Sequence, residues 1–333
     1  MNITLVGAGR MGWIFAKAIA GLHPARLAFV VSRSLESAQK MGEHFGCRIS
    51  TNLEEVLEPS DAVVIATPTL THKDLAILCA KAGKPFFVEK PIADSLENGK
   101  EMVIAAEKHS VQSMVGFQRR FDPAFVQAKK HIEAGGIGKL EIFRSISRDA
   151  SMGSSSLEWH LQSGGLIVDL GVHDMDLARW FMGEVVAVQS FGGALTDPGL
   201  SRHGLHDTAV AILQFASGAF GTIEMGRNTA YGHEVRAEIL GAAGKCSIER
   251  DQRGDLRIYD ASGGSFDRPR GFEERFAQAY IEEMAAFVRG VMHQETLMPN
   301  VRDAWYSLRL AMAAQKALDT GQTVRVEEFG GAL

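Results

Sequence analysis

The pattern of apolar and polar residues changes about one third of the way along the chain. In the first third, short apolar runs such as 2–6, 26–31 and 61–67 alternate with stretches of helical spacing such as 35–46 and 72–82. Continuous apolar runs are typical of parallel strands that are covered on both faces. Residues 1–118 are therefore predicted to form a doubly wound α/β domain with a parallel sheet.

From about residue 119 the strands follow one another without intervening helices. Strands are expected at 140–149, 208–215, 219–225 and 234–240, and helices at 273–290 and 303–319. Such a succession of strands predicts antiparallel pairing. We expect residues 119–333 to form an α+β domain with a large, mainly antiparallel open sheet.

Composition and charge narrow the class of protein. The 333 residues suit two domains, and a net charge of -5 without basic runs argues against nucleic acid as a partner. No apolar run approaches a membrane span, and the first strand begins where a signal peptide would lie. Cys47, Cys79 and Cys246 are odd in number and scattered, so neither a disulfide framework nor a thiolate metal site is indicated. The cytoplasm is the expected location.

A glycine-rich turn follows the first strand. Gly7, Gly9 and Gly12 form a G-x-G-x-x-G pattern between the strand and a helix that runs to Ala20. In a dinucleotide-binding fold the first glycine makes the turn, the second lets the backbone approach the pyrophosphate, and the third lets the helix pack on its strand. The context of strand and helix favours a dinucleotide-binding Rossmann domain over a simple glycine-rich turn.

The end of the second strand bears on the choice of coenzyme. An acidic residue there binds the ribose 2′-hydroxyl of NAD, but this chain has Ser32, Arg33 and Ser34. A guanidinium without a neighbouring carboxylate suits the 2′-phosphate of NADP. NADP is therefore favoured, and NAD remains possible if Arg33 only stacks on the adenine.

Acid and imidazole groups recur on one predicted helix. From Gly165 onward the spacing is helical, which places Asp169, His173 and Asp176 on one face. This pattern alone fits a solvated face or a core histidine as well as it fits a catalytic site. Lys90 favours catalysis because it lies at the carboxyl edge of the sheet, where the nicotinamide would lie. A neutral histidine could then accept the proton of a substrate hydroxyl, with Asp169 holding it and Lys90 stabilising the alkoxide.

Three motifs in this order resemble the glucose–fructose oxidoreductase and inositol dehydrogenase family. They are the glycine turn 7–12, the Glu-Lys-Pro segment 89–91, and Gly164-Gly165 followed by Asp169 and His173. The resemblance covers nearly the whole chain. Segments 116–123, 146–149, 231–234 and 275–280 further resemble bacterial myo-inositol 2-dehydrogenases.

The resemblance implies roles for individual residues. Lys90, Asp169 and His173 would form the catalytic triad, and His173 would accept the proton. The substrate would be bound by these three together with Arg120, Asp149 and Tyr231. The coenzyme would be bound by Gly7, Gly9, Arg10, Met11, Gly12, Ser32, Arg33, Thr67, Pro68, His72, Glu89 and Lys90. Self-association through the second sheet, as a dimer or tetramer, is also implied.

Three positions depart from the inositol dehydrogenase pattern. Ser32 replaces the acid that NAD-preferring members usually carry, His233 stands where a tyrosine is usual, and Asp149 where an asparagine can occur. The first departure bears on the coenzyme and the other two on the polyol.

The sequence thus predicts an NAD(P)-dependent dehydrogenase that oxidises a secondary hydroxyl of a cyclic polyol or sugar. Myo-inositol is the first expected substrate, followed by scyllo-inositol, a pyranose sugar and a 1,5-anhydro sugar. A non-catalytic NADP-binding sensor is the alternative from another class. A metal enzyme using His203, His206 and Asp207 is disfavoured because their spacing and the preceding Pro198-Gly199 indicate a loop. No metal is expected.

Overall fold

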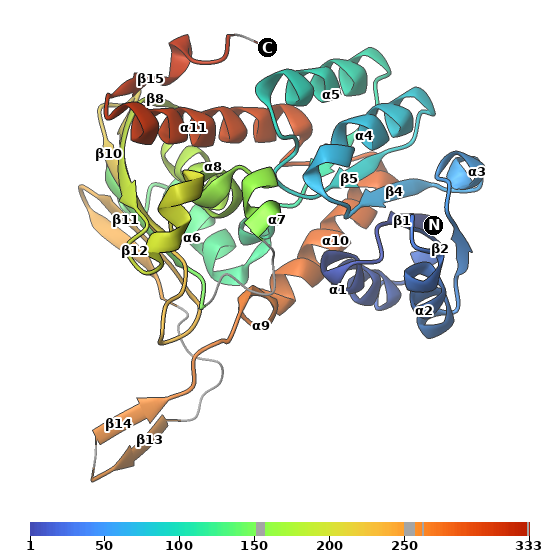
Figure 1. The fold of residues 1–333 in the computed structure, drawn as a ribbon, viewed down its shortest axis with the longest axis horizontal. Coiled ribbons are helices and arrows are strands. Elements are labelled where there is room, and N and C mark those ends of the chain that lie inside the picture. Colours follow the sequence, from blue (N-terminus) through green and yellow to red (C-terminus); the bar gives the residue numbers. More distant parts are fainter. Residues whose placement is uncertain (151–156, 250–256, 262, 332) are drawn as a thin grey trace. The chain divides into compact units, whose positions relative to one another are not determined.

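The computed structural model of the chain describes residues 1–150, 157–249, 257–261, 263–331 and 333. It consists of two compact units (Figure 1). Unit 1 contains Met1–Phe121 and Gln278–Tyr306, and unit 2 contains Asp122–Ala277 and Ser307–Leu333. Within the described residues, no helix is both long and apolar enough to cross a bilayer.

Unit 1 is built on a parallel sheet of six strands in the order β3-β2-β1-β4-β5-β6. The strands are β1 (Asn2–Val6), β2 (Arg26–Val31), β3 (Arg48–Ser50), β4 (Ala62–Ile65), β5 (Phe86–Val88) and β6 (Ser113–Val115). This order confirms the predicted Rossmann fold, in which the connections run outward from β1 in both directions. The apolar pattern of the sequence does not predict β3, which has only three residues.

Helices cover both faces of this sheet (Figure 1). One face carries α1 (Arg10–Ala20) and α2 (Leu35–Phe45), and the other carries α4 (His72–Lys81) and α5 (Leu96–Lys108). The short α3 (Glu54–Leu57) precedes β4. Burial on both faces explains why β4 is buried along its whole length.

Unit 1 also includes a segment from near the C-terminus. In α10 (Ala277–His293), Tyr280 lies 6.0 Å from Phe15 and Phe287 lies 5.9 Å from Phe87, ring centre to ring centre. These aromatic contacts attach α10 to the face that carries α1. Residues 278–306 thus belong to unit 1 together with Met1–Phe121. The domain bounds 1–118 and 119–333 stay a prediction.

Unit 2 contains a sheet of seven strands in the order β12-β11-β7-β10-β9-β8-β15. The strands are β7 (Leu140–Arg148), β8 (Val185–Gly193), β9 (Thr208–Phe215), β10 (Phe220–Gly226), β11 (Glu234–Gly241), β12 (Gly244–Ile248) and β15 (Val324–Arg325). All neighbouring pairs are antiparallel except β7 and β10. The sheet is thus mixed and mainly antiparallel, as predicted. A separate hairpin pairs β13 (Arg257–Asp260) with β14 (Gly263–Phe266).

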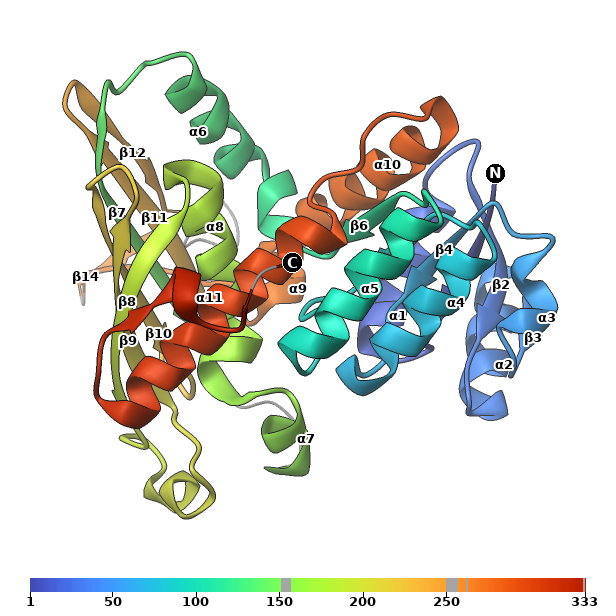
Figure 2. The ribbon, with the colours of Figure 1, turned by 90° about the horizontal axis from the view of Figure 1, so that it is seen from above.

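Helices lie on one face of the second sheet (Figure 2). They are α6 (Pro123–Glu133), α8 (Val172–Met182) and, from Ser307 on, α11 (Val301–Thr320). Two serines of β7 attach α8 to the sheet, because Ser145 and Ser147 both donate hydrogen bonds to the buried carboxylate of Asp174. Side chains on the other face of β9 are exposed, including the apolar Val210 and Ile212.

Candidate active site

The glycine turn has the backbone geometry that a bound dinucleotide requires. Gly7 has φ +110°, and a Cβ there or at Gly12 would overlap a neighbouring carbonyl oxygen, that of Ala66 or of Gly7. A Cβ at Gly9, by contrast, would meet nothing within 4 Å, so that the backbone there is open to a ligand. Gly9 is also the N-cap of α1, whose first turn has no acidic residue to offset the helix dipole. The turn therefore fits a pyrophosphate. Arg10 and Met11 begin the helix.

The end of β2 presents polar and cationic side chains. The Oγ of Ser32 accepts a hydrogen bond of 3.3 Å from the Ser34 backbone, and Ser34 in turn caps α2. Arg33 is exposed between them. These contacts hold the loop and leave the guanidinium at the surface.

Two loops at the carboxyl edge of the first sheet are joined by His72. Its ring nitrogens lie 2.8 Å from the carbonyl oxygen of Thr67 and 3.0 Å from that of Pro91, and the residue is 1% exposed. Burial lowers the pKa of His72, against the opposing effect of the carbonyls. A neutral ring can donate only one proton, so it donates to one carbonyl at a time. The imidazole is thus used to connect the two loops. Pro68, next to Thr67, is exposed.

Glu89 and Lys90 follow β5 directly. Glu89 is buried, and its carboxylate accepts a hydrogen bond of 2.9 Å from the Lys90 backbone. It also influences Glu283 of α10, which is completely buried and whose carboxyl oxygens have no hydrogen-bond partner among the described residues. Burial, and then the charge of Glu89, raise the pKa of Glu283 well above its ordinary value. Glu283, which was not predicted from the sequence pattern, therefore favours the protonated form more than an exposed glutamate does.

Asp169 and His173 lie on a helical segment of unit 2, as predicted, but the segment is not α-helical throughout. Residues Ile167–Gly171 form a π-helix, and α8 begins at Val172. Such π-turns are rare and often occur at functional sites. Both side chains are buried, with 8% of Asp169 and 6% of His173 exposed. Asp176, further along the same face, accepts a hydrogen bond of 3.0 Å from Ser307. It therefore connects α8 to α11.

The partner of Asp169 is an arginine that the pattern analysis missed. Arg227 directly follows β10, is 5% exposed and forms an ion pair with the Asp169 carboxylate. Its other terminal nitrogen lies 2.5 Å from Nδ1 of His160 in α7 (Leu157–Gln162). The one sequence feature that could have indicated Arg227 is its position just after a predicted strand.

Asp149 and His233, two of the departures noted above, are in contact. Nδ1 of His233 lies 3.1 Å from the Asp149 carboxylate, and the ring is buried against Phe276. They lie next to different strands, since Asp149 directly follows β7 and His233 directly precedes β11. The two unusual residues therefore form one pair.

Tyr231 belongs to a neighbouring polar network. Its hydroxyl donates to Glu234 at 2.6 Å and accepts from Arg148 at 3.0 Å. Burial by itself raises the pKa of Glu234, but Tyr231, Arg236 and Arg148 lower it below the ordinary value. Tyr231 is nevertheless 48% exposed, so that its ring can also contact a ligand.

Arg120 lies in unit 1, where it forms an ion pair of 2.7 Å with Asp303. Lys90 also belongs to unit 1, whereas Asp169, His173, Asp149 and Tyr231 belong to unit 2. The predicted triad and substrate contacts thus draw on both units, and their convergence stays a prediction.

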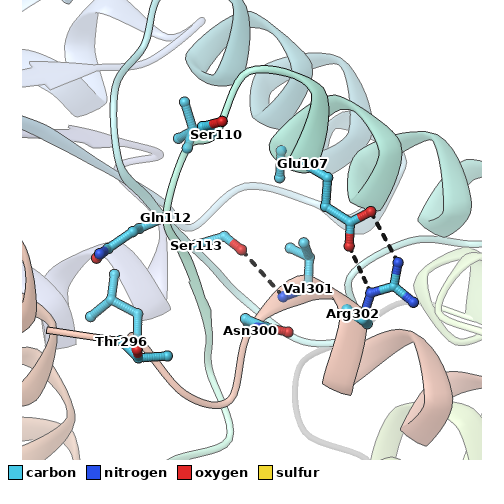
Figure 3. Close-up of a pocket in the computed structure, with 11 residues that line it drawn as sticks. Glu107, Ser110, Gln112, Ser113, Thr296, Asn300, Val301 and Arg302 are labelled. Atoms are coloured by element: carbon cyan, nitrogen blue, oxygen red, sulfur yellow. Dashed lines mark hydrogen bonds and ion pairs between the residues drawn. The ribbon is translucent and has the colours of Figure 1, made fainter.

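A cavity of about 270 Å³ in unit 1 lies at the amino edge of the parallel sheet, opposite the carboxyl edge that carries Glu89 and Lys90. Figure 3 shows residues that line it. It is lined by Ser113 at the start of β6, by the last turn of α5 and by the first turn of α11. Glu107 and Arg302 form a bidentate ion pair beside it, with distances of 2.6 and 3.0 Å. Ligands of open α/β sheets bind at the carboxyl ends of the strands, so this cavity is not the coenzyme site.

Asp207 has a structural function in its loop. Its carboxylate accepts hydrogen bonds from the backbone of 195–197 and from the hydroxyl of Thr208. Those contacts lower its pKa, against the opposing effect of burial. These hydrogen bonds occupy the carboxylate that would have to bind the metal ion in a metal enzyme.

Two family models match the chain. A model described as an oxidoreductase family with an NAD-binding Rossmann fold matches residues 1–117, and a GFO/IDH/MocA C-terminal domain matches 125–247. Among curated proteins, the chain is 36% identical to a scyllo-inositol 2-dehydrogenase (NAD(+)) of Bacillus subtilis, over 98% of this chain and 96% of that protein. It is 34% identical to a myo-inositol 2-dehydrogenase of Thermotoga maritima, over 99% and 100%.

Solved structures agree with these matches. The scyllo-inositol dehydrogenase of Lactobacillus casei with bound NAD(H) and scyllo-inositol superposes with a TM-score of 0.93, at 29% identity over 98% of this chain and 99% of that one. A myo-inositol dehydrogenase of Corynebacterium glutamicum gives 0.93, at 29% identity over 98% of both chains. Fold and sequence agree from end to end, and the chain belongs to the GFO/IDH/MocA family of oxidoreductases.

Proposed function

We propose that this oxidoreductase oxidises one secondary hydroxyl group of an inositol to a ketone. Myo-inositol, giving scyllo-inosose, is the first substrate, and scyllo-inositol is the second. The observation that carries the proposal is full-length similarity to proteins named as inositol 2-dehydrogenases. Asp169 in the π-helix and His173 in α8 are both buried. They support the proposal because oxidation of a hydroxyl group needs a proton acceptor.

The proposed triad divides the work among three residues. His173 takes the proton of the reacting hydroxyl, which requires its neutral form. Asp169 orients the imidazole and stabilises the cation that forms, and Lys90 stabilises the developing alkoxide. When bound, the nicotinamide supplies the acceptor for the hydride of the carbinol carbon.

The remaining hydroxyl groups need polar partners. Asp149, Tyr231 and Arg120 are the proposed ones, and each is already held by a charged or polar neighbour. Preorganised side chains of this kind lose little conformational freedom on binding. Because Asp149 is paired with His233, we propose that this pair contributes to the choice among inositol stereoisomers.

The coenzyme is proposed to be a nicotinamide dinucleotide held by the glycine turn, with further contacts from Arg10, Met11, Thr67, Pro68, His72 and Glu89. The exposed Arg33 beside Ser32 favours NADP. The names of two matched proteins, by contrast, carry NAD. Both coenzymes must therefore be assayed.

Self-association is part of the proposal. The exposed apolar residues Val210 and Ile212 on the outer face of β9 support association through the second sheet, as a dimer or tetramer. We also propose a cytoplasmic location, on the three cysteines, all of which are free thiols.

One spectrophotometric screen tests the function. The purified protein is incubated with myo-inositol, scyllo-inositol, glucose and a 1,5-anhydro sugar, each with NAD and with NADP. We expect coenzyme reduction with at least one inositol. Coenzyme reduction with a sugar but with neither inositol would show that a sugar, and not an inositol, is the substrate. Tight coenzyme binding without turnover of any polyol would favour the sensor reading.

A further inference from the structure

Arg227 connects the end of β10 to two elements of unit 2 that lie 58 and 67 positions earlier in the sequence. One terminal nitrogen contacts Asp169 in the π-helix, and the other contacts His160 in α7. Its backbone N–H donates to the carbonyl oxygen of Asp207 at 2.8 Å, which fixes the position of the chain after β10. All three residues of the Asp169–Arg227–His160 cluster are more than nine-tenths buried.

The contact with His160 determines the form of that imidazole. A guanidinium has only donors, so Nδ1 of His160 must accept the hydrogen bond and cannot carry a proton. His160 is therefore neutral, with its proton on Nε2. An imidazolium, which has protons on both nitrogens, would lose this bond and bring a second positive charge against Arg227.

The contact with Asp169 offsets a buried negative charge. His173 follows Asp169 by four residues, which is about one helical turn. An uncompensated carboxylate near an imidazole stabilises the protonated imidazolium. A guanidinium on the same carboxylate opposes that effect. Asp207 does not compete for Arg227, because its carboxylate is directed to the backbone of 195–197 and to Thr208.

We propose that Arg227 is a positioning residue of the active site, which fixes Asp169 and the tautomer of His160 and keeps His173 in the neutral form that accepts a proton. The part that concerns His173 rests on the proposed function. The part that concerns His160 does not.

Two substitutions separate the charge of Arg227 from its geometry. Arg227→Lys keeps the positive charge but has a single nitrogen, which cannot contact Asp169 and His160 together in the same way. Arg227→Gln removes the charge. The pH dependence of kcat/KM for inositol oxidation is measured for both variants and for the unmodified protein.

In Arg227→Gln the acid limb of the profile should move to higher pH by about one unit, because Asp169 favours the protonated His173 more strongly without the guanidinium. In Arg227→Lys the limb should stay near its original position, although turnover falls. A lower kcat with an unchanged profile in Arg227→Gln would show a purely structural role and overturn the proposal for His173.

The tautomer of His160 is tested without any enzymatic turnover. Nitrogen-15 NMR of the histidine side chains, with His160→Gln used for assignment, should show His160 as the neutral Nε2–H form from about pH 5 to pH 8. A His160 that becomes protonated over this range would overturn the assignment even if Arg227→Gln fails to fold. If no inositol is turned over, the proposed function fails, and this spectrum still decides whether Arg227 fixes the tautomer of His160.

Discussion

The two units hold their functional groups in place by different means. In unit 1 the coenzyme turn is defined by backbone shape. A Cβ atom at Gly7 or Gly12 would overlap a carbonyl oxygen, whereas the space beside Gly9 is open to a ligand. In unit 2 the candidate site is defined by paired side chains, which are Asp169 with Arg227 and Asp149 with His233. Short sequence motifs determine backbone conformation, whereas side-chain pairing joins parts of the chain that are distant in the sequence. The first kind of site should fail by steric overlap and the second by loss of charge or hydrogen bonds.

Loss of the proposed base in unit 2 should have the largest effect. His173→Ala is expected to lower kcat by about 10²- to 10⁴-fold, because no other group replaces the proton acceptor. Coenzyme affinity, measured by fluorescence titration, should change little because the proposed dinucleotide site lies in unit 1. His203→Ala, which changes an exposed histidine at the end of the 3-10 helix Pro198–His203, is the matched control and should retain activity. A His173→Ala enzyme with near-normal turnover would remove this residue from the mechanism.

The turn in unit 1 should be sensitive to a single methyl group. In Gly12→Ala the new Cβ overlaps the carbonyl oxygen of Gly7, which must move. We expect coenzyme binding to weaken at least about tenfold and stability to fall by about 1–3 kcal/mol. Gly21→Ala is the control, because its nearest neighbouring atom would lie 3.6 Å away. Equal behaviour of the two variants in a coenzyme titration and a thermal melt would contradict the role given to backbone shape.

Arg33 tests whether one exposed side chain modifies the coenzyme site. Arg33→Ala should weaken NADPH about tenfold and NADH much less, because only NADPH carries the phosphate that the guanidinium would contact. Lys40→Ala removes another exposed cation, one that pairs with Glu36 in α2. It should leave both affinities unchanged. Equal losses for the two coenzymes in Arg33→Ala would show that the residue does not select NADP.

Glu283 is the exception within unit 1, because it is a buried side chain without the partner that Asp169 has. A carboxyl group whose pKa is raised on folding binds more protons in the folded state. Its contribution to stability is fully present at low pH and decreases as the pH rises above about 4.3, by up to about 1.4 kcal/mol per pH unit. The decrease ends at the raised pKa of the folded protein.

Glu283→Gln should remove this dependence and make the protein more stable than the original chain at neutral and higher pH. Denaturant unfolding between about pH 5 and pH 8 measures the slope. Glu282→Gln, at the exposed neighbouring position, should change it little. A wild-type slope retained in Glu283→Gln would mean that another group titrates.

Residues close together in the sequence were sufficient for much of this description. Strand, glycine turn and helix at the N-terminus give a local pattern, because backbone conformation and burial are decided within a few residues. The same holds for most strands of the second sheet, for the helix that carries His173 and for the family motifs. The family and the class of reaction follow from these local features.

Other features depended on the folded chain. The π-helix at Ile167–Gly171, the parallel pairing of β7 with β10 and the packing of α10 on Phe15 and Phe87 have no local signature. The same is true of Arg227, which meets Asp169 across 58 positions of sequence. The energy of a buried charge is set by the groups that surround it in space, and these come from several strands and helices. The amino-acid order therefore predicted the reacting groups, and only the packing of distant segments showed with which side chains Asp169 and Asp149 are paired.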